Sequence, residues 1–288
     1  MPAIVCMANT SDVLGEVPIW SVREQALYWI DAFKPGLHRY DAKTGAVTSR
    51  TPPVKLGSFA LRAGGGFLLA SRSGLGTYDP SSGRFDLIHD PEADRPNNLL
   101  NDGRCDRRGR FWVGSMDRMI QQPSARLYRF DPDHSCRVMQ DEIYLSNGIA
   151  FSPDDRTMYF ADSHHKAIYR YDFDLAAGTI ANRRVFATVE HGVPDGACVD
   201  TDGCLWSVQF HASRVVRYTP DGTIDRTIEL PVTQPTACTF GGADLKTLFV
   251  TTAGLRLTDA QRAAQPHAGG LLAIDAGAQG LEEPLFGG

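Results

Sequence analysis

The sequence has no long apolar run, which argues against a membrane-spanning helix. None of its apolar stretches approaches the roughly 18 consecutive residues that such a helix needs, although 42% of the 288 residues are hydrophobic. The N-terminal stretch MPAIVCMANTSDV lacks the basic segment and the cleavage site of a secretory signal. We therefore expect a cytoplasmic protein without a membrane partner.

Excess positive charge, paired cysteines and common catalytic motifs are also missing. The formal net charge is -5, which argues against nucleic acid as a partner. The six cysteines form no CxxC pair, so we expect reduced, partly buried thiols and no cysteine-based metal site. The chain contains neither a GxSxG nucleophile elbow nor a Walker A loop.

Helical periodicity is almost absent, and short strand-like runs recur in its place. The runs are rich in aromatic and β-branched residues, and Gly, Pro, Asp or Asn bounds each of them. They read ALYWID, FLLASR, RFWVGSM, TMYFADS, CLWSVQF and TLFVTT. Aligned on these runs, the chain divides into six units with equivalent points roughly 41 to 48 residues apart, the period of propeller blades.

Each unit reads as about four short strands, which is one blade. No change of composition interrupts the series, so we predict an all-β fold in which residues 1–288 form a single six-bladed β-propeller domain. Residues 90–98 and 255–269 are predicted surface insertions, the second with a short helical turn. We expect the AIVCMA run, residues 3–8, to pair with C-terminal strands and close the ring.

One position of the repeat, just before the first strand of each unit, carries oxygen-bearing side chains in most units. The six residues at this position are Glu16, Gly57, Asn101, Asn147, Asp195 and Thr236. The first strand of every blade lines the central channel, so these residues should form one ring. Unpaired buried carboxylates are costly, and a divalent cation would offset their charge.

Two other interpretations of this pattern remain open. Asn, Asp and Gly also form turns before strands, and many propellers only bind other proteins, although the regular Gly-His and Trp-Asp pairs of such scaffolds are missing here. If the ring binds a metal, we expect one divalent ion. Oxygen ligands favour Ca²⁺, Mg²⁺ or Mn²⁺, and Zn²⁺ and Fe²⁺ also accept carboxylates. About three protein ligands would leave positions for water and substrate.

The sequence resembles the SMP-30/gluconolactonase/regucalcin family over nearly its whole length. The resemblance rests on LGEVPIW, NDGRCDRRGRFWVGSMD, SNGIAFSPDDRTMYFADS, PDGACVDTDGCLW and RVVRYTPDG, in this order. It implies a six-bladed propeller with a central metal site in which Glu16, Asn147 and Asp195 are the ligands. It also implies that Asn101 contacts the substrate or a metal-bound water. Most characterised members of the family are lactonases for aldonic-acid lactones.

The reaction that the resemblance implies is hydrolysis of a sugar-acid lactone to the free sugar acid. The metal ion would act as Lewis acid and Asp195 as general base. Asp117, Arg118 and His211 are further candidates for substrate binding, although a solvated turn or a surface histidine would also account for them. Two alternatives stay open: a Ca²⁺-binding regulatory propeller without turnover, and an esterase or organophosphate hydrolase on the same scaffold. We expect a small-molecule partner and a monomer or weak homo-oligomer.

The sequence departs from the family pattern at two places near the expected channel mouth. Relatives often carry an arginine where this chain has Leu99, and Arg95 and Arg104 are the candidates to replace it. Relatives often read Trp-Gly-Gly where this chain has Phe210, His211 and Ala212. Both departures concern the identity of the substrate rather than the type of reaction.

Overall fold

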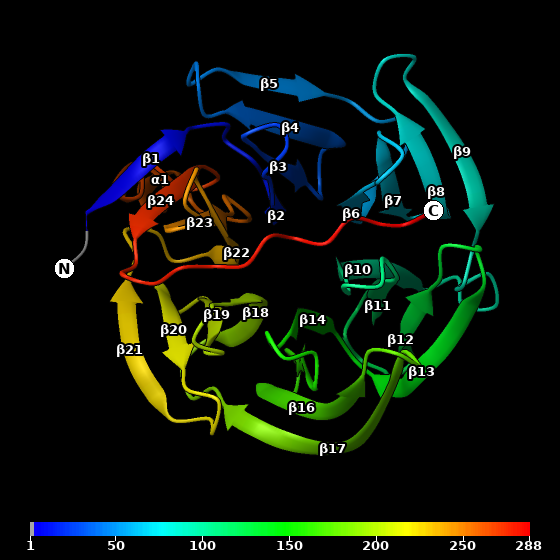
Figure 1. The fold of residues 1–288 in the computed structure, drawn as a ribbon. Coiled ribbons are helices and arrows are strands. Elements are labelled where there is room, and N and C mark those ends of the chain that lie inside the picture. Colours follow the sequence, from blue (N-terminus) through cyan, green and yellow to red (C-terminus); the bar gives the residue numbers. More distant parts are fainter. Residues whose placement is uncertain (1–2) are drawn as a thin grey trace.

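The computed structural model describes residues 3–288 as six four-stranded antiparallel sheets around a central axis (Figure 1). This arrangement confirms the six-bladed β-propeller predicted from the repeat. Within residues 3–288, no helix has the length and apolar character needed to cross a membrane.

The first three blades follow the chain in order, with the innermost strand first. Blade 1 consists of β2 (Gly15–Ser21), β3 (Ala26–Asp31), β4 (Gly36–Asp41) and β5 (Val47–Arg50). Blade 2 consists of β6 (Leu56–Leu61), β7 (Phe67–Ser71), β8 (Gly74–Asp79) and β9 (Arg84–His89). Blade 3 consists of β10 (Asn98–Cys105), β11 (Phe111–Asp117), β12 (Ala125–Phe130) and β13 (Cys136–Ile143).

The remaining blades repeat this order, except that the outermost strand of the last blade comes from the N-terminal part of the chain. Blade 4 consists of β14 (Ser146–Phe151), β15 (Thr157–Asp162), β16 (Ala167–Asp174) and β17 (Thr179–Thr188). Blade 5 consists of β18 (Val193–Val199), β19 (Leu205–Phe210), β20 (Arg214–Tyr218) and β21 (Ile224–Glu229). Blade 6 consists of β22 (Pro235–Gly241), β23 (Thr247–Thr252), β24 (Leu271–Asp275) and β1 (Ile4–Ala8).

The two ends of the chain close the ring in blade 6. Strand β1 pairs antiparallel with β24, so that Ile4 lies opposite Ile274 and Val5 opposite Ala273. The expected pairing of the N-terminal run with a C-terminal strand is therefore confirmed. The six innermost strands β2, β6, β10, β14, β18 and β22 each contact the next around the axis (Figure 1).

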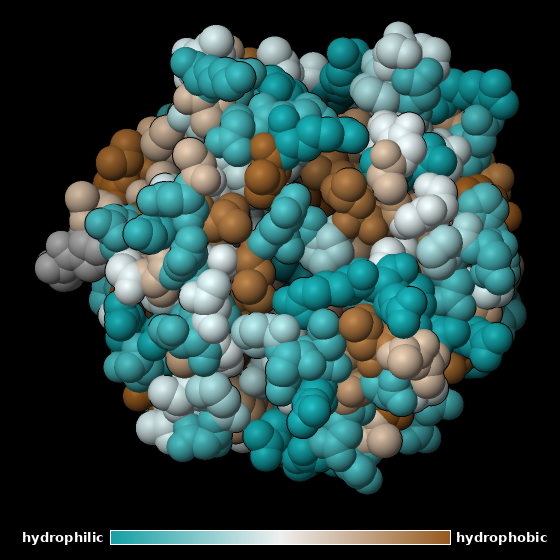
Figure 2. Space-filling model, viewed as in Figure 1, coloured by the Kyte–Doolittle hydropathy of each residue, from teal (hydrophilic) through white to brown (hydrophobic). Residues whose placement is uncertain are grey.

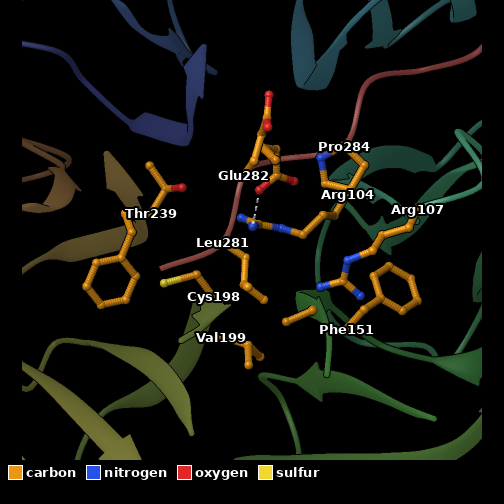
Figure 3. A pocket seen from close by; sticks show the side chains of 12 residues that line it. Arg104, Arg107, Phe151, Cys198, Val199, Thr239, Leu281, Glu282 and Pro284 are labelled. Atoms are coloured by element: carbon orange, nitrogen blue, oxygen red, sulfur yellow. Dashed lines mark hydrogen bonds and ion pairs between the residues drawn. The ribbon is translucent and has the colours of Figure 1, made fainter. Parts of the chain in front are cut away.

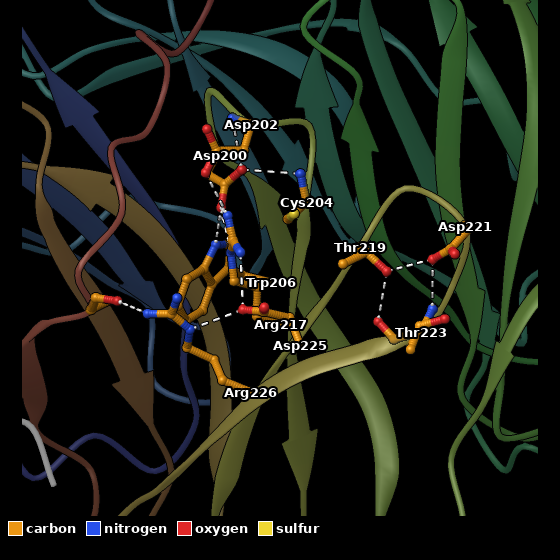
Figure 4. Close-up of polar contacts among 11 residues, drawn as sticks. Asp200, Asp202, Cys204, Trp206, Arg217, Thr219, Asp221, Thr223, Asp225 and Arg226 are labelled. Atoms are coloured by element: carbon orange, nitrogen blue, oxygen red, sulfur yellow. Dashed lines mark hydrogen bonds and ion pairs between the residues drawn. The ribbon is translucent and has the colours of Figure 1, made fainter.

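Buried aspartates anchor the second strand in three blades. The indole nitrogens of Trp29, Trp112 and Trp206 donate to Asp12, Asp106 and Asp200 over 2.9, 2.8 and 2.8 Å. In blade 5 the Nε of Arg217 also donates to Asp200, over 2.8 Å, so one fully buried carboxylate links two neighbouring strands (Figure 4). Each aspartate thus satisfies an indole N–H that would otherwise be buried without a partner.

Every innermost strand contains a register irregularity close to its ring position. The irregularities fall between Glu16 and Ile19, Leu56 and Ser58, Leu100 and Gly103, Asn147 and Ala150, Pro194 and Ala197, and Pro235 and Ala237. A bulge breaks the strict alternation of a strand and redirects a side chain. The repeat therefore provides one such redirection per blade, all at the same end of the channel.

The opposite end of the channel lies under the C-terminal tail, residues 276–288, which crosses the propeller from blade 6 to blade 2 (Figure 1, red). Phe286 anchors the tail: its N–H donates to Leu61 O over 2.8 Å, and Ala63 N–H donates to Phe286 O over 2.9 Å. Its ring is fully buried and stacks on Phe130 at 5.6 Å. The surface on this side is mostly hydrophilic, with apolar residues in separate patches (Figure 2).

Two smaller expectations also agree with the structure. The insertion in blade 6 contains the short helix α1 (Asp259–Ala264), which begins with a capping box between Thr258 and Gln261. All six cysteines are free thiols.

Candidate metal centre in the central channel

Glu16 enters the channel from the bulge of β2. The following residue, Val17, is buried and has φ = 51°, a strained conformation for a β-branched side chain. The Glu16 side chain is half-buried. Desolvation raises its pKa well above the usual range, and the negative charges of Asp195 and then Asp102 raise it further.

Asp195 lies in β18 and is 8% exposed. Desolvation raises its pKa well above the usual range, and the charge of Asp102 adds to the effect. Within residues 3–288, neither Glu16 nor Asp195 forms a salt bridge with an arginine, lysine or histidine, and the N–H groups of Val17 and Gly196 oppose the rise of their pKa values. Two carboxyl groups thus lie near each other in the channel without a cationic partner.

The Asn147 amide has a fixed orientation. Its Nδ2 donates to Ser163 Oγ over 2.9 Å, and that hydroxyl donates to Pro194 O over 2.6 Å. Its Oδ1 accepts from Asn101 Nδ2 over 2.9 Å, which leaves a second lone pair of the oxygen for another partner. Gly148, at φ = 59°, is required here, because a β-carbon would lie 2.9 Å from the Asp195 carbonyl oxygen.

Asn101 therefore touches a predicted metal ligand directly. Its Nδ2 also donates to the Ser146 carbonyl over 2.9 Å. The structure thus brings Asn101 into direct contact with Asn147.

Asp102 is a third carboxylate of the channel, which the sequence reasoning missed. Its Oδ2 accepts from Ile149 N–H over 3.2 Å, and its charge acts on both Glu16 and Asp195. Asn-Asp-Gly is a common turn sequence, so the sequence pattern did not identify Asp102 as a channel residue. The one indication in the sequence was that Asp102 directly follows the ring residue Asn101.

The other two ring positions brace the site. A β-carbon on Gly57 would lie 1.9 Å from Leu100 O, so only glycine fits between β6 and β10. Thr236 Oγ1 donates to Gly15 O and lies 2.8 Å from Thr251 Oγ1. Its hydroxyl thus ties β22 to β2 immediately before Glu16.

The donor set of the ring fits a divalent cation. It combines two carboxyl groups that lack a cationic partner with the oxygen of an amide group whose orientation two hydrogen bonds fix, and oxygen donors of this kind suit hard ions. Within residues 3–288, no three His, Cys, Asp or Glu side chains form a group that could hold a metal ion. A metal at this place would therefore depend on the Asn147 amide as its third protein ligand.

The three remaining candidates lie at or directly after the ends of β11 and β19, opposite the beginnings of the inner strands β10 and β18. Asp117 is buried, and its Oδ2 accepts from the N–H groups of Gln121 and Gln122 over 2.7 and 3.1 Å, so it caps its own loop. Arg118 is exposed. His211, at φ = 65°, directly follows β19, and desolvation lowers its pKa, so it is neutral at pH 7.

Arg95 and Arg104, the two candidates to replace the arginine that relatives carry at the position of Leu99, lie in different parts of the structure. Arg104 lies at the far end of the channel, where its Nη1 is 2.7 Å from Glu283 Oε2 in the tail. Arg95 remains on the side of the ring, with its Nη1 donating to Ser124 O over 2.5 Å. Arg104 is thus committed to the channel floor rather than to the substrate.

Known proteins are similar to this chain in sequence and in fold. Residues 14–254 match the SMP-30/Gluconolactonase/LRE-like region. The chain is 40% identical to a 6-deoxy-6-sulfogluconolactonase of Pseudomonas putida over 285 residues, 98% of each chain. It is 37% identical to an L-arabinolactonase of Azospirillum brasilense over 288 residues, 98% of this chain and 95% of the relative. A calcium-binding regucalcin from Agrobacterium tumefaciens superimposes with a TM-score of 0.94 at 29% identity, covering 99% of this chain and 97% of that one.

Proposed function

We propose that the chain, which belongs to the SMP-30/gluconolactonase/LRE-like family, hydrolyses a sugar-acid lactone with the help of one divalent metal ion. The observation that carries the proposal is the pair Glu16 and Asp195, two carboxyl groups without a cationic partner beside the fixed amide of Asn147. The similarity to a sulfogluconolactonase and an L-arabinolactonase supports lactone opening as the reaction.

In this proposal Glu16, Asn147 and Asp195 hold the ion, which can be Ca²⁺, Zn²⁺, Mn²⁺, Mg²⁺ or Fe²⁺. A bound ion would supply Lewis-acid stabilisation of the charge that develops on the lactone carbonyl oxygen. Asn101 orients Asn147 through its 2.9 Å hydrogen bond and reaches the substrate with its remaining polar groups.

Asp195 is the general base. It takes a proton from the attacking water while the water oxygen bonds to the carbonyl carbon, and the proton passes to the ring oxygen when the C–O bond of the ring breaks. One water is consumed and one hydroxy acid is formed.

Substrate hydroxyls are held in this proposal by Asp117, Arg118 and His211 at the channel mouth. Since each of the six blades contributes one strand to the channel wall, we also propose that residues 1–288 act as one domain. The substrate in this proposal is a small molecule that enters the channel.

The decisive experiment measures metal content and lactone opening together. The purified protein is assayed on a panel of aldonolactones, including 6-deoxy-6-sulfogluconolactone and L-arabinonolactone, before and after chelation. We expect Asp195→Ala and Glu16→Ala to lose both bound metal and turnover, with kcat/KM lower by at least about 100-fold, while circular dichroism shows an intact fold. Undiminished turnover after complete metal removal would contradict the proposal.

A second candidate is a Ca²⁺-binding regulatory propeller, which the likeness to a calcium-binding regucalcin favours. Reversible Ca²⁺ binding without turnover on any lactone would select it. Turnover of aryl esters or organophosphates in preference to lactones would select a different hydrolase on the same scaffold.

A further inference from the structure

The floor of the channel contains a buried ion pair between the propeller and its tail. Arg104 belongs to β10 and lies beside the tail residues Glu282 and Pro284 at this end of the channel (Figure 3), and Glu283 stands between these two tail residues in the sequence. Arg104 Nη1 lies 2.7 Å from Glu283 Oε2, and the two side chains are only 14% and 10% exposed. They line a cavity of about 40 Å³ beside Cys198 and Thr239, which is space for a few water molecules.

Arg104 interacts with two acidic groups, one by direct contact and one through its charge. Glu283 approaches it from the tail, and Asp102 lies two residues before it in the same strand and interacts with its charge. Cys198 is also near, but burial raises the pKa of its thiol well above the usual range, so this group is uncharged at neutral pH. Arg104 is therefore paired directly with Glu283, while Asp102 acts on it only through its charge.

Asp102 connects this floor to the ring above it. Its carboxylate holds Ile149 N–H, two residues after the predicted ligand Asn147, and its charge acts on Glu16 and Asp195. Asp102 thus lies in sequence and in its electrostatic effect between the ring residues Glu16 and Asp195 and the Arg104–Glu283 ion pair.

We propose that the Arg104–Glu283 ion pair sets the affinity of the ring for its metal ion, with Asp102 as the positioning residue between them. The inference rests on the metal site of the proposed function. While Glu283 neutralises Arg104, the negative charge of Asp102 remains available to the cation above. Without the negative charge of Glu283, the Arg104 guanidinium is a buried cation, and Asp102 is the acidic group that remains to balance it. The uncompensated positive charge of Arg104 then repels a metal ion bound in the channel.

The low dielectric of the channel makes this effect measurable. Charges in a protein interior interact more strongly than in water and are poorly screened by salt. The tail would thereby be part of the metal site although it contributes no ligand.

The test is the dissociation constant of the metal, measured by calorimetry with Ca²⁺ and Mn²⁺ on the full chain. We expect Glu283→Gln to weaken metal binding by about tenfold, which is a free-energy difference of about 1.4 kcal/mol. Glu282→Gln is the matched control, because this neighbour is exposed and should bind the metal like the wild type. The double variant Arg104→Met/Glu283→Met removes both charges and should restore binding to within about threefold of the wild type.

Two further variants provide a second test that does not depend on how well Glu283→Gln folds. Arg104→Met removes the cation and should tighten metal binding. In a chain that already carries Asp102→Asn, adding Glu283→Gln should change the dissociation constant less than it does in the wild type, because the positioning carboxylate is gone.

Two results would overturn the inference while leaving the lactonase proposal intact. One is equal dissociation constants for the wild type and Glu283→Gln, and the other is weaker metal binding in Arg104→Met. A wild type that binds no divalent ion would overturn both proposals.

Discussion

Glu16 and Asp195 destabilise the metal-free fold when they are ionised, although the proposed metal site needs both of them in the ionised form. Both pKa values are raised, first by desolvation, so the folded protein without metal holds protons that the unfolded chain would release. A carboxyl group with a raised folded pKa stabilises the fold fully below its unfolded pKa, and this contribution is lost as the pH rises through the folded value. A metal ion removes the conflict by compensating the charges.

The first prediction follows from this sign. Metal-free Glu16→Gln should be as stable as metal-free wild type at a pH below the unfolded Glu value of 4.5, and increasingly more stable than the wild type as the pH rises. Urea unfolding at a series of pH values measures the difference. Saturating metal should reverse the order at neutral pH, since only the wild type retains both carboxylate ligands. A difference that does not change with pH would contradict the assignment.

Ser163 is the second residue with a specific consequence. It accepts from Asn147 Nδ2 and donates to Pro194 O, so its removal frees the Asn147 amide to rotate. We predict that Ser163→Ala weakens metal binding by about 10-fold or more, as loss of a hydrogen-bond partner of a ligand commonly does. Ser81→Ala, on an exposed turn of blade 2, is the control and should bind the metal normally.

Some residues of the site could be predicted from the sequence, and others could not. The ring positions were identified because they recur with the period of the blades, and the structure supports a short separation for Glu16 and Asp195, whose charges act on each other. Asp102 was hidden in a turn-like Asn-Asp-Gly. The Arg104–Glu283 pair joins residues 179 positions apart, and no local pattern encodes such a contact.

At the scale of the strand, the bulges explain why a simple alternation rule fails at the site. The first strands carry ring residues at one phase of the repeat, but a regular strand would send the neighbours of each ring residue to the opposite face. The irregularity between Leu100 and Gly103 permits Asn101 and Asp102 to act in the same channel. Bulges have no strong sequence signal, so the repeat predicted the strands and not this feature.

The third prediction concerns the aspartate that links β19 and β20. Asp200→Ala removes the acceptor for Trp206 Nε1 and Arg217 Nε and leaves a buried cation with fewer partners. We expect a loss of about 3–5 kcal/mol in the free energy of unfolding, measured by chemical denaturation. Asp221→Ala, on an exposed turn of the same blade, should change it by less than about 0.5 kcal/mol.

At the scale of the whole molecule, the repeat predicted the number of blades and the closure by β1, because both follow from periodicity and from an unpaired apolar run. The path of the tail was not predicted. Its sequence, AGAQGLEEPLFGG, has no alternating pattern, and its position depends on Phe286 filling a space beside Phe130 that only the assembled blades create.

The fourth prediction tests this anchor. Phe286→Ala empties a fully buried site and should lower the free energy of unfolding by about 3–5 kcal/mol. Leu87→Ala, an exposed apolar residue on β9, is the control and should be nearly neutral. An unfolding free energy unchanged by Phe286→Ala would show that the tail does not dock as described.

The pairing of β1 with β24 also has a consequence for biosynthesis. Residues 4–8 are synthesised long before their partners, residues 271–275, so this strand must remain unpaired while five blades are made. During this interval it is an exposed strand edge, the kind of surface on which nascent chains aggregate. The half-exposed Val5 is then a site where a charged substitution would improve the yield of folded protein at little cost to the finished ring.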